Sequence, residues 1–102
     1  MTTTTTTLWD PATHLNSIDD VAAYLQAALE DGDAQLVAAA LGDIAKARGM
    51  TQIARESGLG RESLYKSLSS SGNPELATVL KVISALGLQL HVSPTDKATI
   101  AA

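Results

Sequence analysis

The chain has 102 residues, no cysteine and a formal net charge of −4. This length is typical of one domain with a modest core, which dimerisation would help to stabilise. The lack of cysteine excludes disulfides, thiolate zinc sites and a cysteine nucleophile. No apolar run approaches the roughly 20 residues of a membrane span, and the start lacks the basic segment of a signal peptide, so we expect a cytoplasmic protein.

The charges are unevenly distributed along the chain. Every charged residue up to Asp43 is acidic, whereas residues 46–66 contain five basic and two acidic side chains. A basic segment suits phosphates, and an acidic segment suits a basic protein. The alternative for the acidic residues is that they only keep the protein in solution.

The first half of the chain predicts a Thr-rich disordered tail over residues 1–9 and two helices over residues 18–30 and 34–48. Ser17 is a good N-cap for the first helix, Gly32 can end it, and Asp33 can cap the second. Helical spacing places on the inward faces Ile18, Val21, Ala22, Leu25 and Leu29, then Leu36, Val37, Ala40, Leu41 and Ile44.

Two short helices are predicted over residues 51–57 and 61–68, joined at Gly58 and with Thr51 as a cap. Ala54, Gly58 and Leu64 stand at relative positions i, i+4 and i+10. This spacing resembles the lambda-repressor-like helix-turn-helix, which presents its second helix to the DNA major groove. Gly60 stands where that family usually has an N-cap residue. The alternative is an ordinary helical corner with a solvated charged face. The candidate DNA-binding residues are Thr51, Gln52, Arg61, Glu62, Ser63, Tyr65 and Lys66.

A fifth helix is predicted over residues 74–86, with Asn73 as N-cap and with Leu76, Val79, Leu80 and Ile83 facing inward. Residues 88–92 alternate between apolar and polar side chains, as in a half-buried strand, but the chain offers no partner strand. That strand could pair across a dimer, lie on the domain or extend a partner's sheet. We expect a homodimer through a second apolar strip of the last helix and this strand, and the remaining residues 93–102 as a flexible tail. The candidate interface residues are Thr78, Val82, Ala85, Leu86, Leu88, Leu90 and Val92.

Three segments within residues 10–92 together resemble the addiction-module antidote family of bacteria: DPATHLNSIDDVAAYLQAALEDGD, LGDIAKARGMTQIARESGLGRESLYKSLS and GNPELATVLKVISALGLQLHV. Members of this family are lambda-repressor-like antitoxins encoded beside a small toxin of the RelE/ParE type. The resemblance implies an all-α domain of five helices with a short C-terminal strand. It also implies an antitoxin that binds its toxin and represses the shared operon as a dimer.

The acidic front of the chain is the expected toxin-binding surface, through Trp9, Asp19, Asp20 and Glu30. Trp9 could equally fold back onto its own domain, and the first helix could be core with its acids facing water. An enzyme is a poor alternative, because His14 and His91 are the only histidines and no phosphate-binding loop occurs. We therefore expect no catalytic residues, metal site, cofactor or small-molecule substrate. The stronger alternative is a phage-type repressor without a toxin partner.

Overall fold

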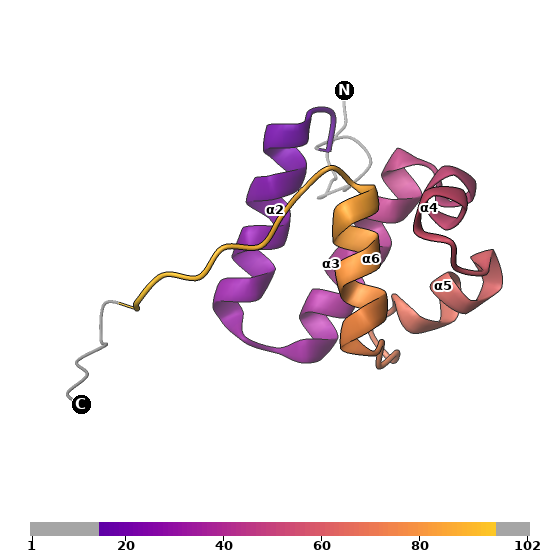
Figure 1. Ribbon diagram of the computed structural model, residues 1–102. Helices are drawn as coiled ribbons and strands as arrows, with labels where there is room; N and C mark the ends of the chain where they lie inside the picture. The colour runs from indigo at the N-terminus through magenta and orange to yellow at the C-terminus, as the bar shows by residue number, and fades with distance from the viewer. Residues whose placement is uncertain (1–14, 96–102) are drawn as a thin grey trace, which may run out of the picture.

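The computed structural model describes residues 15–95, and this part of the chain is all-α, with five helices and no β-strand (Figure 1). The helices are α2 (Ile18–Asp31), α3 (Ala34–Arg48), α4 (Met50–Ser57), α5 (Arg61–Ser67) and α6 (Leu76–Ala85). All five helices expected from the sequence are therefore confirmed, with their ends shifted by at most two residues. None of these helices is long and apolar enough to cross a membrane.

The residues expected to begin and end the first two helices do so. The Ser17 hydroxyl accepts a hydrogen bond from the backbone N–H of Asp20, at 3.1 Å. Gly32 ends α2 in the left-handed conformation, with φ of 80°. The Asp33 carboxylate then accepts from the N–H groups of Gln35 and Leu36 at the start of α3. A turn of only two residues between α2 and α3 holds them as neighbours.

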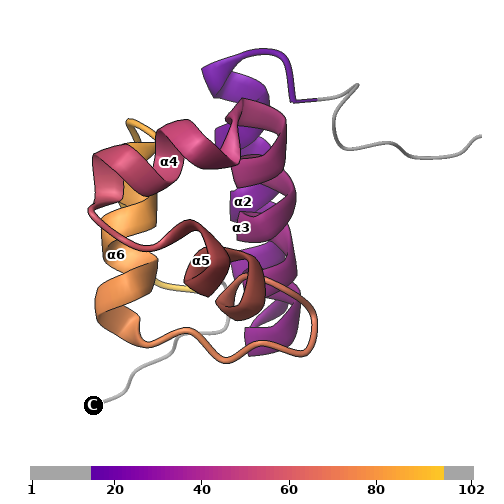
Figure 2. The same cartoon turned by 90° about the vertical axis from the view of Figure 1, so that its right-hand side faces the viewer.

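The helices surround one apolar core. α2 packs mainly against α3, α6 packs mainly against α4, and α5 contacts both α3 and α4 (Figures 1 and 2). Tyr24 of α2 donates a hydrogen bond from its hydroxyl to Asp43 of α3, at 2.8 Å. The largest fully buried side chains come from four helices and the turn after α5: Val21, Leu41, Ile44, Leu64, Leu68 and Val82.

α3 and the end of α5 approach each other closely at Gly42. A Cβ atom at Gly42 would overlap the carbonyl oxygen of Leu68 and lie 3.0 Å from its carbonyl carbon. A residue without a side chain is therefore required in the middle of α3, where glycine is otherwise unfavourable. This contact fixes the position of α5 relative to α3.

The starts of α4 and α6 differ from expectation. α4 begins at Met50 with Gly49 at its N-cap, so Thr51 lies inside the helix and does not cap it. α6 begins at Leu76 with Glu75 at its N-cap, so Asn73 and Pro74 lie in the preceding loop. The backbone of Glu75 is extended, with ψ of 155°, as is usual for an N-cap residue.

The strand expected over residues 88–92 is wrong for this structure. Gly87, with φ of 80°, follows the end of α6, and the chain then continues to residue 95 without forming a strand (Figure 1). Leu88 packs against the core, while Leu90 and Val92 are exposed. The described chain offers no second strand to receive backbone hydrogen bonds, which explains the irregular conformation.

Several apolar side chains expected to face inward are exposed. On α2 they are Ile18 and Leu29, on α3 Leu36, and on α6 Leu76 and Leu80. Leu36 lines a groove between α2 and α3 and faces Ala27 and Ala28 of α2. Because these two side chains are small, they leave Leu36 45% exposed. α6 buries Ile83 as expected, but it also buries Val82 and Leu86, so its inward face is rotated relative to expectation.

Candidate functional site

α4 and α5 form a corner that local hydrogen bonds hold in place. Gly58 has φ of 76°, and its N–H donates to the carbonyl of Ala54 at 3.0 Å. The N–H of Leu59 donates to the same carbonyl at 3.2 Å and approaches the Ser57 hydroxyl at 3.3 Å. A left-handed residue at this position favours glycine, as the sequence predicted. The corner therefore has a defined geometry that sets the direction of α5.

One face of α5 is buried and the other is exposed. Leu64 in the middle of the helix and Leu68 at its C-terminal end are almost fully buried in the core. The guanidinium carbon of Arg61 lies 5.6 Å from the centre of the Tyr65 ring, a cation–π contact between neighbouring turns. The structure thus brings together on the exposed face five of the predicted residues: Arg61, Glu62, Ser63, Tyr65 and Lys66.

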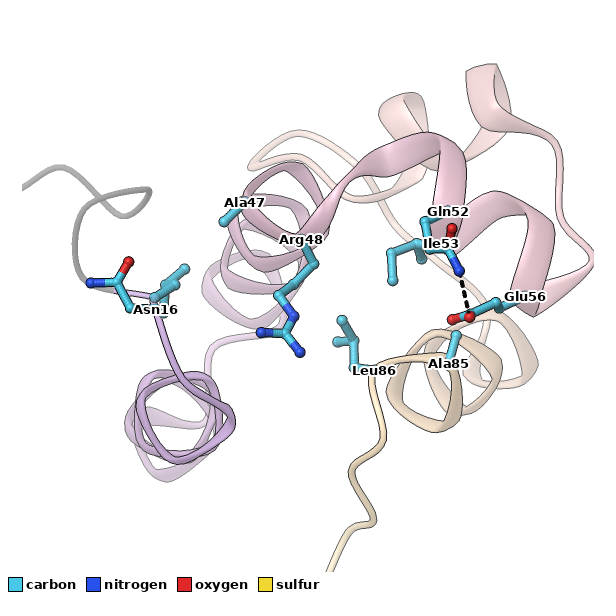
Figure 3. A pocket seen from close by; sticks show the side chains of 9 residues that line it. Asn16, Ala47, Arg48, Gln52, Ile53, Glu56, Ala85 and Leu86 are labelled. Carbon is cyan, nitrogen blue, oxygen red and sulfur yellow. Dashed lines mark hydrogen bonds between the residues drawn. The ribbon is translucent and has the colours of Figure 1, made fainter.

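The two remaining candidates, Thr51 and Gln52, lie on α4. Thr51 is exposed near the start of α4. Gln52 donates from its side-chain amide to the Glu56 carboxylate at 2.6 Å, and both side chains line a cleft that reaches Leu86 at the end of α6 (Figure 3). Gln52 is therefore engaged within α4 and lines a cleft to which no α5 residue contributes.

That cleft was not expected from the sequence. Its volume is about 530 Å³, and it lies between the start of α2 and the ends of α3 and α6, with α4 beside it. The Arg48 guanidinium points into it toward Leu86 (Figure 3). The sequence signal for Arg48 was only its favourable place at the negative end of a helix. Within residues 15–95, no group of three or more His, Asp or Glu side chains could hold a metal ion.

The acidic candidates for toxin binding lie on α2. Asp19, Asp20 and Glu30 are exposed, and Glu30 accepts a hydrogen bond from the Gln26 side chain at 3.0 Å. Trp9, like His14, lies outside the described residues.

The apolar strip proposed for dimerisation is contradicted at two of its residues. Val82 is 0% exposed and Leu86 is 4% exposed, because α6 turns this side toward α4 and the core. Thr78, Ala85 and Leu88 are half-buried. The exposed leucines of α6 are Leu76, at 70%, and Leu80, at 47%. An interface formed by α6 would have to use this outer face.

Comparison with known proteins identifies a family and one bacterial relative of the chain. Residues 5–94 match the family model described as "Probable addiction module antidote protein". The chain is also 51% identical, over 84 residues, to an uncharacterized protein of Haemophilus influenzae, and the match covers 82% of this chain and 87% of the relative. No solved structure matches. The chain belongs to the family of probable addiction module antidote proteins.

Proposed function

We propose that this protein is the antitoxin of a type II toxin–antitoxin module, which binds a cognate toxin and represses the shared operon by binding its operator DNA. The family match supports the antitoxin role. The exposed face of α5, which carries Arg61, Tyr65 and Lys66 after the hydrogen-bonded α4–α5 corner, supports the DNA-binding role. In this proposal α4 and α5 act as a helix-turn-helix, with α5 in the major groove.

Arg61 is the residue proposed to read a base. Its guanidinium can donate two hydrogen bonds to a guanine edge, and the stacked Tyr65 ring restricts its position. Lys66 would contact a phosphate, and Glu62 would either accept from cytosine or pair with Lys66 one turn later. Ser63 and Thr51 would donate to phosphates. Gln52 could donate to a phosphate only if its hydrogen bond to Glu56 were broken.

A homodimer is part of the proposal, because operators are usually read as two half-sites. We propose that the outer face of α6 forms the interface through Leu76 and Leu80, together with the exposed Leu90 and Val92. Thr78, Ala85 and Leu88 would contribute at its edge. Val82 and Leu86 are no longer candidates.

The DNA-binding role predicts a specific loss for Arg61→Ala. Removal of a bidentate base contact costs about 1–3 kcal/mol, which is roughly a 5- to 150-fold loss of operator affinity at fixed salt. Arg61→Lys should recover little of the affinity, since an ammonium cannot form the two-pronged contact. Gel-shift titrations with the DNA upstream of the gene measure both variants.

Arg48→Ala is the matched control. It removes the same charge, but the Arg48 side chain lies at the end of α3 and points into the cleft, whereas Arg61 lies on α5. Its operator affinity should stay near that of the wild type. Equal losses for Arg61→Ala and Arg48→Ala would contradict a base contact by Arg61. A protein that binds the operator normally but has no toxin gene beside its own would instead support the stand-alone repressor.

A further inference from the structure

A shallow apolar groove lies between α2 and α3. Its volume is about 210 Å³, and its lining includes a single charged residue, Asp43, whose carboxylate already accepts the Tyr24 hydroxyl. Its other lining residues are Tyr24, Ala27, Ala28, Leu36, Ala39 and Ala40. Leu36 leaves almost half of its surface exposed at the edge of this groove. No lining residue belongs to α4, α5 or α6.

The edges of this groove are acidic. On α2, Asp20 and Asp31 share one stripe with the groove residues Tyr24 and Ala27, since these four positions are three or four residues apart along the helix. Asp43 supplies a third carboxylate from α3, and Lys46, one turn later, marks where the acidic edge ends. The groove therefore presents an apolar floor between negative charges.

We infer that this groove is the docking site for the toxin, and that it takes an aliphatic side chain flanked by lysine or arginine residues. The inference rests on the antitoxin role proposed above and specifies which surface of the antitoxin is used. The aliphatic side chain packs on Leu36 and the alanines, and this burial slows dissociation. The flanking cations face Asp20, Asp31 and Asp43, which speeds the encounter and rejects acidic segments.

This docking site shares Asp20 with the acidic front surface expected from the sequence, but it excludes Asp19 and Glu30. Those two residues lie on a separate stripe of α2, about one quarter of a turn from the stripe of Asp20 and Asp31. It also leaves the exposed face of α5 unoccupied. Toxin and operator can then be bound by the same molecule.

The test compares two pairs of substitutions that remove the same charge from α2. The first variant combines Asp20→Asn with Asp31→Asn, and the second combines Asp19→Asn with Glu30→Gln. Calorimetric titration of the full-length chain with the toxin encoded by the adjacent gene, at two salt concentrations, measures affinity. The first variant should bind at least tenfold more weakly at low salt and show a flatter salt dependence, while the second should resemble the wild type. Equal effects of the two variants would overturn the inference.

A second comparison tests the apolar floor with two partly exposed leucines. Leu36→Lys places a charge at the groove, and Leu29→Lys places the same charge on α2 at a residue that does not line the groove. Leu36→Lys should reduce toxin affinity at least 100-fold, and Leu29→Lys should leave the toxin affinity unchanged. Undiminished toxin binding by Leu36→Lys would overturn the inference. A loss of self-association in this variant would also overturn it, because it would assign the groove to a second copy of the chain. Failure of the wild type to bind the toxin would instead contradict the antitoxin role itself.

Discussion

Gly42→Ala should destabilise the protein, although alanine is the better helix former. In an exposed helix this change would be worth about 1 kcal/mol in favour of folding. Here the new methyl group would overlap the carbonyl oxygen of Leu68. The methyl group can be accommodated only if the backbone at Leu68 moves, because no flexible side chain is available to move instead. We therefore expect a net loss of about 1–3 kcal/mol or more in the free energy of unfolding. Urea denaturation followed by circular dichroism measures it.

Gly60→Ala is the control for this prediction. Gly60 has φ of −70°, which any residue can adopt, and its added Cβ would lie 3.6 Å from the Ser63 hydroxyl oxygen, an ordinary contact. The only expected cost is that of a poorer N-cap, about 1 kcal/mol. If Gly42→Ala were as stable as the wild type, α3 and the end of α5 could not approach as closely as described.

Val82→Glu and Leu80→Glu should have opposite consequences, although they lie two residues apart on α6. Val82 is fully buried, so its replacement places a carboxylate in the core at a cost of several kcal/mol. Since domains are stable by only about 5–15 kcal/mol, this variant should be largely unfolded or melt far below the wild type. Leu80 is 47% exposed, and Leu80→Glu should stay folded.

The Leu80→Glu variant also tests the proposed dimer. Two carboxylates brought together at a twofold interface repel each other, so the folded variant should sediment as a monomer and bind the operator weakly. Thermal melting by circular dichroism and sedimentation velocity distinguish loss of fold from loss of assembly. A Val82→Glu protein that melts like the wild type would contradict the orientation of α6. A Leu80→Glu protein that remains dimeric would move the interface elsewhere.

Local features of the sequence predicted the helices and the α4–α5 corner well. The positive φ at Gly58, the buried Leu64 and the Ser17 cap each depend on residues within a few positions along the chain. Such features follow from backbone geometry and from the spacing of apolar residues along one helix. The residues on the exposed face of α5 could be named for the same reason.

The errors arose where the outcome depends on residues distant in sequence. α6 is apolar around much of its circumference, so periodicity alone could not decide whether Val82 or Leu80 faces the core. The exposure of Leu36 depends on the small alanines of α2 across the groove. The need for glycine at position 42 depends on the carbonyl of Leu68. The prediction of a strand over residues 88–92 was wrong because it rested on the alternation of apolar and polar residues. A strand also needs a neighbouring strand for its backbone hydrogen bonds, and alternation does not provide one.

Binding of the toxin to the DNA-bound antitoxin tests the proposed function most directly. The full-length chain, the protein encoded by the adjacent gene and the upstream DNA fragment would be mixed and analysed by size-exclusion chromatography with light scattering. The groove on α2 and α3 and the exposed face of α5 use separate residues. We therefore expect one species that contains all three components. An adjacent protein that does not bind the chain, with or without DNA, would contradict the antitoxin function.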